Sequence, residues 1–131
     1  MRRIIFMVLM ISILFTNFNS YGQNNKKKDP CENAQTQVEM NDCAKREFDK
    51  ADAKINKVYN QLMSKLEGEH KTKLKTAELA WIKYRDANCE CESFLNQGGT
   101  IYPLVYNGCL TTMTNNRIKE LTEYLTEIDS H

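Results

Sequence analysis

Five cysteines, in a sequence of 131 residues, are the side chains with the most evident chemistry. They can form two disulfides and leave one thiol over. The spacing favours Cys31–Cys43, because Cys31 precedes a helix start and Cys43 lies about two turns inside that helix. It also favours Cys89–Cys109, because closing that short loop would remove about 3 kcal/mol of unfolded-chain entropy. Cys91 is then expected to stay free, and a bridge from Cys43 to Cys89 or to Cys91 is the competing geometry.

Cys89 and Cys91 also form a Cys-x-Cys pair, for which a metal site or a redox thiol is the alternative. A metal site needs further ligands, and the sequence has only two histidines, His70 and His131. Neither histidine lies near the pair in the sequence. We therefore expect no metal site, no cofactor and no catalytic design that needs several imidazoles.

Carboxylates are the other groups that could do chemistry. Glu32, Glu39, Asp42 and Asp52 could supply the paired acids of a glycoside hydrolase. Acid-rich helical surfaces are usually solvated faces, so we expect that the protein is not an enzyme. The formal net charge is +1, and the five glycines form no Gly-rich loop, which argues against nucleic-acid binding and against a phosphate cradle.

The first 22 residues have the pattern of a secretory signal peptide. Arg2 and Arg3 form a basic start, residues 4–15 are almost entirely apolar, and Ser20-Tyr21-Gly22 places small residues before a cleavage site. The apolar run is shorter than the roughly 20 residues that a membrane-spanning helix needs. An uncleaved membrane anchor is therefore the weaker alternative. We expect no other association with a membrane.

Cleavage after Gly22 would leave a polar leader followed by one small domain. Residues 23–30 contain three lysines and nothing to bury, so we expect them to be flexible. The folded domain is expected over 31–128. Removing Arg2 and Arg3 from the 18 basic residues leaves 16, against 17 acidic residues, which is a net charge of −1. All five cysteines lie in this exported part, so we expect a periplasmic or secreted protein.

Helical periodicity predicts the first two elements of the domain. Thr36 and Glu39 have the spacing of a capping box, and apolar residues then recur at steps of three and four, which predicts a helix over 37–66. A second helix is expected over 71–91, returning antiparallel to the first as a helical hairpin. The first stripe consists of Ala44, Phe48, Ala51, Ile55, Val58, Leu62 and Leu66, and the second of Leu74, Ala77, Trp81, Tyr84 and Asn88.

Residues 92–107 contain Gly98-Gly99 and Tyr102-Pro103, which break the periodicity and predict an ordered loop. A short strand over 101–105 is the alternative within it. A last helix is expected over 108–127. The predicted fold is therefore all-α, a small disulfide-bridged domain made of a long helical hairpin and a C-terminal helix, in which the bridges support a small core.

The hairpin would bring together an aromatic and charged cluster. If the chain turns near residues 68–69, Trp81 lies opposite Asn56, and Arg85 lies opposite Asp52 in an arginine–carboxylate contact. The neighbouring Asp86 would point elsewhere. Such a contact more often pairs helices than binds a ligand, so a structural role is favoured and a binding role is the alternative. The whole structural cluster consists of Asp52, Asn56, Tyr59, Trp81, Tyr84 and Arg85.

Several short motifs follow one another between residues 31 and 125. They are Thr36-x-x-Glu39-x-x-x-Cys43, Ala51-Asp52-x-x-Ile55-Asn56-x-x-Tyr59, Trp81-Ile82-x-Tyr84-Arg85-Asp86-x-x-Cys89, Cys109 and Thr114-x-x-Arg117-x-x-x-Leu121. Their order and spacing resemble the lysozyme inhibitor LprI-like family. The resemblance implies a small helical, disulfide-bridged exported domain, inhibition of lysozyme in at least the namesake branch, and neither enzyme activity nor a cofactor. Glu78, where the family usually has Gln, and the extra Cys91 depart from the pattern.

The expected function is a non-catalytic binding protein that inhibits a lysozyme by filling its sugar cleft. The candidate contact is the glycine-containing loop at Gly98, Gly99, Thr100, Ile101 and Tyr102, because glycine lets a backbone approach closely. The alternative explanation of the glycines is that they only mark a loop and have no binding role. The alternative function is an envelope structural or stress module that binds peptidoglycan fragments or another envelope protein, with Trp81 or Tyr102 stacking on a sugar or anchoring an interface.

Overall fold

The first long helix begins at the expected capping box. The computed structural model describes residues 30–130, and in it the Thr36 hydroxyl accepts from the Glu39 amide while the Glu39 carboxylate accepts from the Thr36 amide. A short 3-10 turn, η1 (Pro30–Asn33), precedes α1 (Gln37–Lys65). The predicted stripe is the buried face of α1, because Ala51, Ile55, Val58 and Leu62 are buried.

The second helix, α2 (Gly68–Ser93), is longer than expected and buries a different face. Its buried residues are Glu78, Arg85, Cys89 and Ser93, none of which is aliphatic. The stripe predicted for this helix is thus partly wrong, since Tyr84 is 61% exposed. The apolar periodicity of α2 is weak, so the buried charged residues Glu78 and Arg85 decide which face of the helix turns inward.

The third helix, α3 (Tyr102–Asp129), corrects the prediction of a loop over 92–107. A 3-10 turn, η2 (Phe94–Asn96), and a few further residues are all that separate it from α2. Pro103 stands in the first turn of α3, where a helix needs no amide donor, so Tyr102-Pro103 starts a helix instead of breaking one. The alternative strand over 101–105 is also wrong, because the Val105 amide donates to the Ile101 carbonyl within that first turn.

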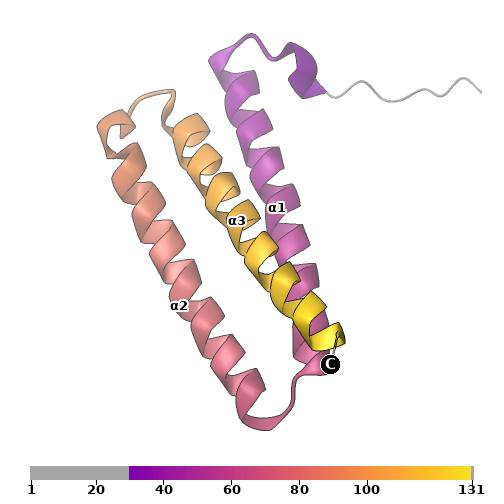
Figure 1. The fold of residues 1–131 in the computed structure, drawn as a ribbon. Helices are drawn as coiled ribbons and strands as arrows, with labels where there is room; N and C mark the ends of the chain where they lie inside the picture. The colour runs from indigo at the N-terminus through magenta and orange to yellow at the C-terminus, as the bar shows by residue number, and fades with distance from the viewer. Residues whose placement is uncertain (1–29, 131) are drawn as a thin grey trace, which may run out of the picture.

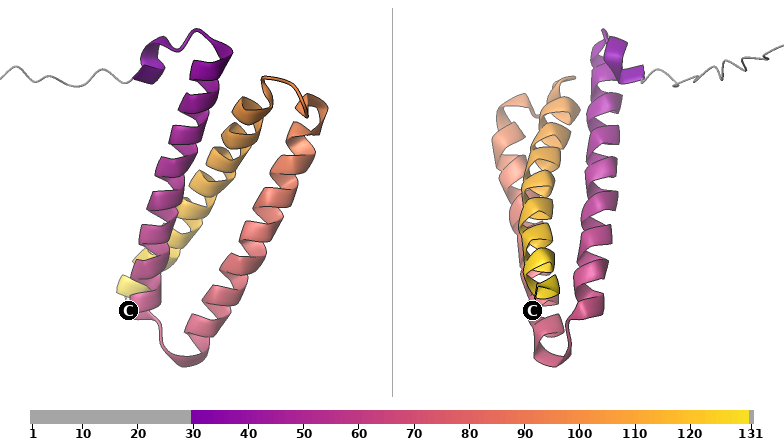
Figure 2. Two further views of the ribbon diagram at one scale, coloured as in Figure 1. Left: turned by 180° about the vertical axis from the view of Figure 1, so that it is seen from behind. Right: turned by 45° about the vertical axis from the view of Figure 1, so that its right-hand side comes forward.

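The three helices form a bundle in which α3 is the common neighbour. Figure 1 shows α1 and α3 running in one direction and α2 running in the opposite direction, and Figure 2 shows α3 against both. Close backbone approaches are most numerous between α1 and α3, fewer between α2 and α3, and nearly absent between α1 and α2. The hairpin is therefore antiparallel as predicted, but its two helices are held apart and each packs on α3.

Two buried clusters lie along the bundle. One is aliphatic and consists of Ile55, Val58, Leu62, Ile118 and Leu121, with Leu74 and Trp81 among the residues packed against it. The other consists of Cys89, Cys109 and Leu110, with Phe48, Tyr106 and Met113 packed against it. We call the end where α2 ends and α3 begins the tip end, and the end where α1 turns into α2 the turn end. The cysteine cluster lies near the tip end, and Leu62 and Leu121 lie near the turn end.

None of the helices within residues 30–130 is long and apolar enough to cross a membrane. The predicted signal peptide over 1–22 and nearly all of the leader over 23–30 lie outside the described residues. The described residues contain helices and no strand, so the predicted all-α class is confirmed.

Candidate functional site

Arg85 is the residue that connects all three helices. Its guanidinium lies 5.3 Å from the ring centroid of Phe48 on α1 and 5.2 Å from that of Trp81, one turn earlier on α2. It also donates to the hydroxyl of Thr114 on α3 at 3.4 Å. A cation between two aromatic faces is stabilised by both rings, so Arg85 fills the space between α1 and α2 without needing aliphatic contacts.

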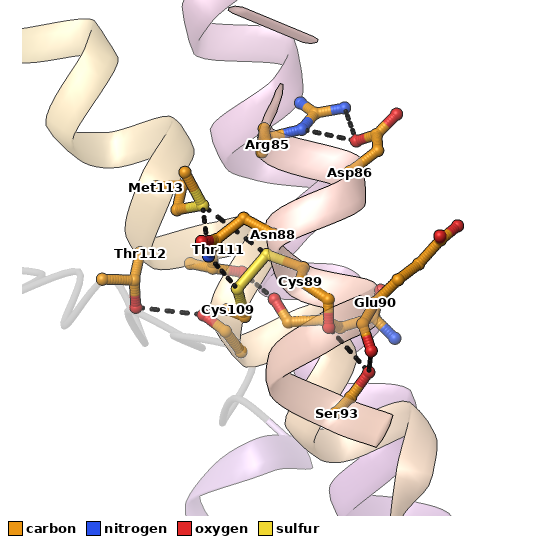
Figure 3. The surroundings of a disulfide bond; sticks show 12 residues. Arg85, Asp86, Asn88, Cys89, Glu90, Ser93, Cys109, Thr111, Thr112 and Met113 are labelled. Atoms are coloured by element: carbon orange, nitrogen blue, oxygen red, sulfur yellow. Dashed lines mark hydrogen bonds and ion pairs between the residues drawn. A yellow bond between two sulfur atoms is a disulfide. The ribbon is translucent and has the colours of Figure 1, made fainter. Parts of the chain in front are cut away.

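The closest carboxylate to Arg85 is not the predicted one. Asp86 accepts from the Arg85 Nε at 2.8 Å and also lies 2.8 Å from Nη2, whereas Asp52 on α1 is 4.0 Å away. The expected contact between Arg85 and Asp52 is present at this longer distance. The prediction that Asp86 points elsewhere is wrong, because the buried guanidinium turns toward the carboxylate next to it, as Figure 3 shows.

The rest of the predicted cluster is only partly assembled. Trp81 is half-buried, and it packs against the aliphatic cluster. Asn56 is exposed and donates to the backbone carbonyl of Asp52 at 2.8 Å and to its carboxylate at 3.1 Å. Tyr59 is half-buried on the same side. Tyr84 is exposed and does not belong to the cluster, because it points away from the face of α2 that carries Arg85.

A second ion pair, between Glu78 on α2 and Arg117 on α3, was not predicted. Arg117 Nε donates to Glu78 at 2.8 Å, and Arg117 also binds Glu120 at 2.7 Å. Desolvation by itself lowers the pKa of Arg117. The hydrogen bonds that Arg117 donates to Glu78 and Glu120 have the larger combined effect, so the pKa of Arg117 is raised above its ordinary value. Arg117 belongs to one of the motifs that carry the family resemblance and Glu78 departs from the family pattern, but no feature of the sequence pairs the two residues.

The Cys89–Cys109 disulfide joins α2 to α3 just below the tip end, and Figure 3 shows its surroundings. Asn88 donates to the sulfur of Met113 at 3.4 Å, and the Ser93 hydroxyl donates to the Cys89 carbonyl at 2.7 Å. Cys31 and Cys43 form the other disulfide, which fastens η1 to the start of α1. These are the two pairs that the sequence spacing favours. The free cysteine is Cys91, and it is exposed.

The segment over residues 94–102, which we call the tip, has a defined backbone. Gly98 has a φ of 78°, which an L-residue adopts only with strain, and a Cβ on Gly99 would lie 3.1 Å from the Asn96 carbonyl oxygen. Both glycines therefore have a conformational reason to be there. Asn41 on α1 donates to the Thr100 carbonyl at 2.8 Å and so ties the tip to the first helix.

The tip exposes apolar side chains on this fixed backbone. Leu95 is 92% exposed, Phe94 is 65% exposed and Ile101 is 40% exposed. Tyr102 is half-buried and stacks on Tyr106 with their ring centroids 5.7 Å apart, so it is part of α3 packing more than of a loop. Burial raises the pKa of Tyr106, and the charges of Asp86 and Glu90 raise it further.

Two grooves run along the bundle. The α1–α2 groove has a volume of about 210 Å³ and is lined by residues of both helices where their backbones stand apart. A wider groove of about 660 Å³ lies toward the turn end, between α2 and the second half of α3. The α1–α2 groove is lined by Asp52, Ile55, Asn56, Tyr59, Lys75, Glu78, Leu79, Trp81, Ile82 and Arg85.

Among residues 30–130, His, Cys, Asp and Glu side chains form no group of three that could hold a metal ion. Two of the four carboxylates considered for glycoside chemistry have structural contacts: Glu39 caps α1, and Asp52 accepts a hydrogen bond from Asn56. The exposed apolar tip and the α1–α2 groove are the candidate binding surfaces.

Comparisons with known proteins agree with this picture. The sequence profile of the family described as lysozyme inhibitor LprI matches residues 28–121. A protein of Rhizobium meliloti (strain 1021), named uncharacterized protein R02472, is 33% identical over 108 residues, which is 72% of this chain and 78% of that protein. No solved structure matches significantly.

Proposed function

Because the chain belongs to the lysozyme inhibitor LprI family, we propose that it is an exported, non-catalytic protein that inhibits a lysozyme by inserting its tip into the enzyme's sugar-binding cleft. Export is supported by the signal-peptide pattern over 1–22 and by two disulfides, which persist in oxidising compartments. The family is described as one of lysozyme inhibitors, and inhibition by occupying a cleft needs no catalytic residue.

The observation that carries the proposal is the exposure of Leu95 on a backbone that cannot move freely. An apolar side chain that is 92% exposed contributes nothing to the fold, and such side chains often mark a binding surface. The tip is held by the Cys89–Cys109 disulfide on one side and by the Asn41–Thr100 hydrogen bond on the other. A fixed tip loses little conformational entropy on binding, so more of its contact energy appears as affinity.

The shape and chemistry of the tip suit a glycosidase cleft. Glycosidases place two carboxylates on either side of the bond that they cleave, and a body that fills the space between them excludes the glycan. At Gly98 and Gly99 no side chain keeps an enzyme surface away from the tip backbone. Thr100 is exposed and supplies a hydroxyl. The predicted contact residues Gly98, Gly99, Thr100, Ile101 and Tyr102 are therefore kept in the proposal, and Phe94 and Leu95 are added.

Charge next to the tip favours a basic partner. Glu90 and Glu92 are exposed on the last turn of α2, directly before the tip. Acidic groups at the rim of an interface attract a cationic protein and raise the association rate, an effect that salt weakens. These two residues supply the local patch that the nearly neutral net charge of the chain does not.

The experiment measures lysis of a peptidoglycan suspension by lysozyme, with and without excess purified protein. We expect wild type to inhibit and Leu95→Asp to lose at least tenfold in inhibitory potency, because it places a charge at the centre of the contact. Tyr124→Asp is the matched control, because Tyr124 is 64% exposed near the turn end. This variant should inhibit lysozyme like wild type.

Two outcomes would contradict the proposal. Undiminished lysis with excess folded wild type would exclude inhibition of the enzymes tested. Equal inhibition by wild type and by Leu95→Asp would keep the inhibitory activity but remove the tip from its site. Circular dichroism of each variant establishes that it is folded before its inhibition is compared.

A further inference from the structure

We propose that the α1–α2 groove is a binding site for a single uncharged pyranose ring. This inference does not depend on inhibition of lysozyme, because the groove lies along the side of the bundle and shares no residue with the tip. It stands on three observations: the apolar wall of the groove, the polar groups that face it, and the internal neutralisation of its buried charges.

The wall of the groove on the α2 side is apolar. Leu79 is 53% exposed, Ile82 is 39% exposed, and Trp81 lies between them in the sequence with its ring half-buried. A pyranose ring has faces made of C–H groups, which pack on aromatic and aliphatic surfaces because such surfaces present no competing hydrogen-bonding group. These three side chains give the ring a surface on which to lie.

The wall on the α1 side is polar. Asn56 uses its amide nitrogen to donate to Asp52, and in the described part of the chain its amide oxygen accepts no hydrogen bond. Asp52 and Tyr59 add a carboxylate and a phenol. Sugar hydroxyls both donate and accept, so a carboxylate, an amide oxygen and a phenol fixed on one helix face suit them. The Asn56–Asp52 hydrogen bonds hold these groups in place before a ligand arrives.

The charges within the groove select for an uncharged ligand. Arg85 is neutralised by Asp86, and Glu78 is neutralised by Arg117, so neither buried charge is available to an ionic ligand. Asp52, which lies 4.0 Å from Arg85, and Lys75 are the other charged groups of the groove, and their charges are opposite. A ligand with a net charge would meet one of them unfavourably and would lose its hydration at the apolar wall. The volume of about 210 Å³ leaves room for one ring rather than for an extended chain.

The packing of the bundle explains why this groove exists. Arg85 lies between Phe48 and Trp81 and keeps α1 and α2 from closing on each other, while α3 packs behind them. If α1 and α2 packed directly, the exposed parts of Leu79 and Ile82 would be buried. Holding the helices apart with a charged side chain leaves an open site that needs no rearrangement on binding.

The test uses the single tryptophan of the chain as a reporter. Purified protein labelled with ¹⁵N is titrated with methyl N-acetyl-β-glucosaminide, which is uncharged, and the Trp81 indole signal is followed by NMR. Glucosamine and glucuronate are the cationic and anionic probes. We expect a saturable shift of the indole signal at millimolar concentrations of the uncharged sugar, and at least fivefold weaker binding of both charged sugars.

Asn56→Leu should weaken binding of the uncharged sugar at least fivefold, because it removes the amide oxygen. Asn60→Leu is the matched control: Asn60 is exposed one turn further along α1, does not line the groove, and should bind within twofold of wild type. An indole signal that the uncharged sugar leaves unmoved, equal binding of all three sugars, or unchanged binding by Asn56→Leu would each overturn the proposal. Leu95→Asp should bind the sugar like wild type, so failure of this site and failure of the tip are distinguishable.

Discussion

At the tip end of the bundle the buried cluster is built around a disulfide, whereas toward the turn end it is built from aliphatic side chains. Cys89, Cys109 and Leu110 form the first cluster, and Ile55, Val58, Leu62, Ile118 and Leu121 form the second. The Cys31–Cys43 disulfide also lies at the tip end, at the start of α1. Near the turn end, Lys65 on α1 pairs with Asp129 at the end of α3 through exposed side chains.

The difference teaches how a small domain can expose apolar residues and still fold. A domain of this size buries little apolar surface, so a surface that leaves Phe94 and Leu95 in solvent must be stabilised by other means. Covalent bonds do this without consuming apolar side chains. The aliphatic end stabilises the fold through packing, and the disulfide end is free to expose apolar side chains.

The largest expected effect is at the aliphatic end. Leu62 is fully buried, so Leu62→Ala should lower the free energy of unfolding by about 3–4 kcal/mol, through lost burial and the cavity that remains. Urea denaturation monitored by circular dichroism measures this change. Leu79→Ala, at a half-exposed position of α2, is the control and should cost much less. A loss below about 1 kcal/mol for Leu62→Ala would mean that the aliphatic cluster does not hold this end.

The next effect is at the disulfide end. Replacing Cys89 and Cys109 together by Ala should cost about 3 kcal/mol, since it releases a loop of the unfolded chain. Hydrogen exchange should accelerate most over the tip and the first turns of α3, and lysozyme inhibition should weaken as the tip loses its fixed backbone. Cys91→Ala is the control and should leave the free energy of unfolding, the hydrogen exchange and the lysozyme inhibition unchanged.

Peptide mapping of the unreduced protein provides a direct check on the same end. It should find Cys31 joined to Cys43 and Cys89 joined to Cys109. A bridge from Cys43 to Cys89 or to Cys91 would break the comparison between the two ends, because α1 and α2 would then be linked directly. The apolar tip would in that case depend on a different covalent frame.

The smallest expected effect concerns the start of α1, also at the tip end. Backbone hydrogen bonds from Thr36 and Gln35, followed by the Thr36 hydroxyl, hold the pKa of Glu39 below its ordinary value. Because the folded pKa is lowered, the stabilisation is present above the ordinary pKa of about 4.5 and is lost as the pH falls through the lower folded value. The first turn of α1 should therefore fray in acid, seen as faster amide exchange at Glu39. Glu39→Gln keeps the capping box without the charge and should remove this pH dependence; an unchanged dependence would exclude Glu39 as its source.

Local signals in the sequence predicted much of the fold, and their failures have physical causes. The capping box and the regular stripe of α1 depend on residues within a few turns of one another, so they could be identified without tertiary information. The prediction of a loop between α2 and α3 was wrong because glycine and proline occur both in loops and at the starts of helices. Only the continuation of Tyr102-Pro103 into packed helical turns shows which of the two applies.

Parts of the candidate site were predictable to the same extent. The contact between Arg85 and Asp52 followed from the register of an antiparallel hairpin and is found at 4.0 Å. The exclusion of Tyr84 from the cluster and the half-burial of Trp81 did not follow, since both depend on how α2 rotates against α3. The Glu78–Arg117 pair joins residues 39 positions apart, and no periodicity within one helix relates them.

The sequence by itself determined the helical class and the limits of α1, and it favoured the pairing of cysteines that are close along the chain. These follow from composition and from interactions between near neighbours. Only the tertiary structure decided that α1 and α2 both pack on α3, that α2 turns a charged face inward, and that a groove stays open between α1 and α2. Each of these depends on which distant side chains neutralise or cover one another, because a buried charge is tolerated only where the fold brings it a partner.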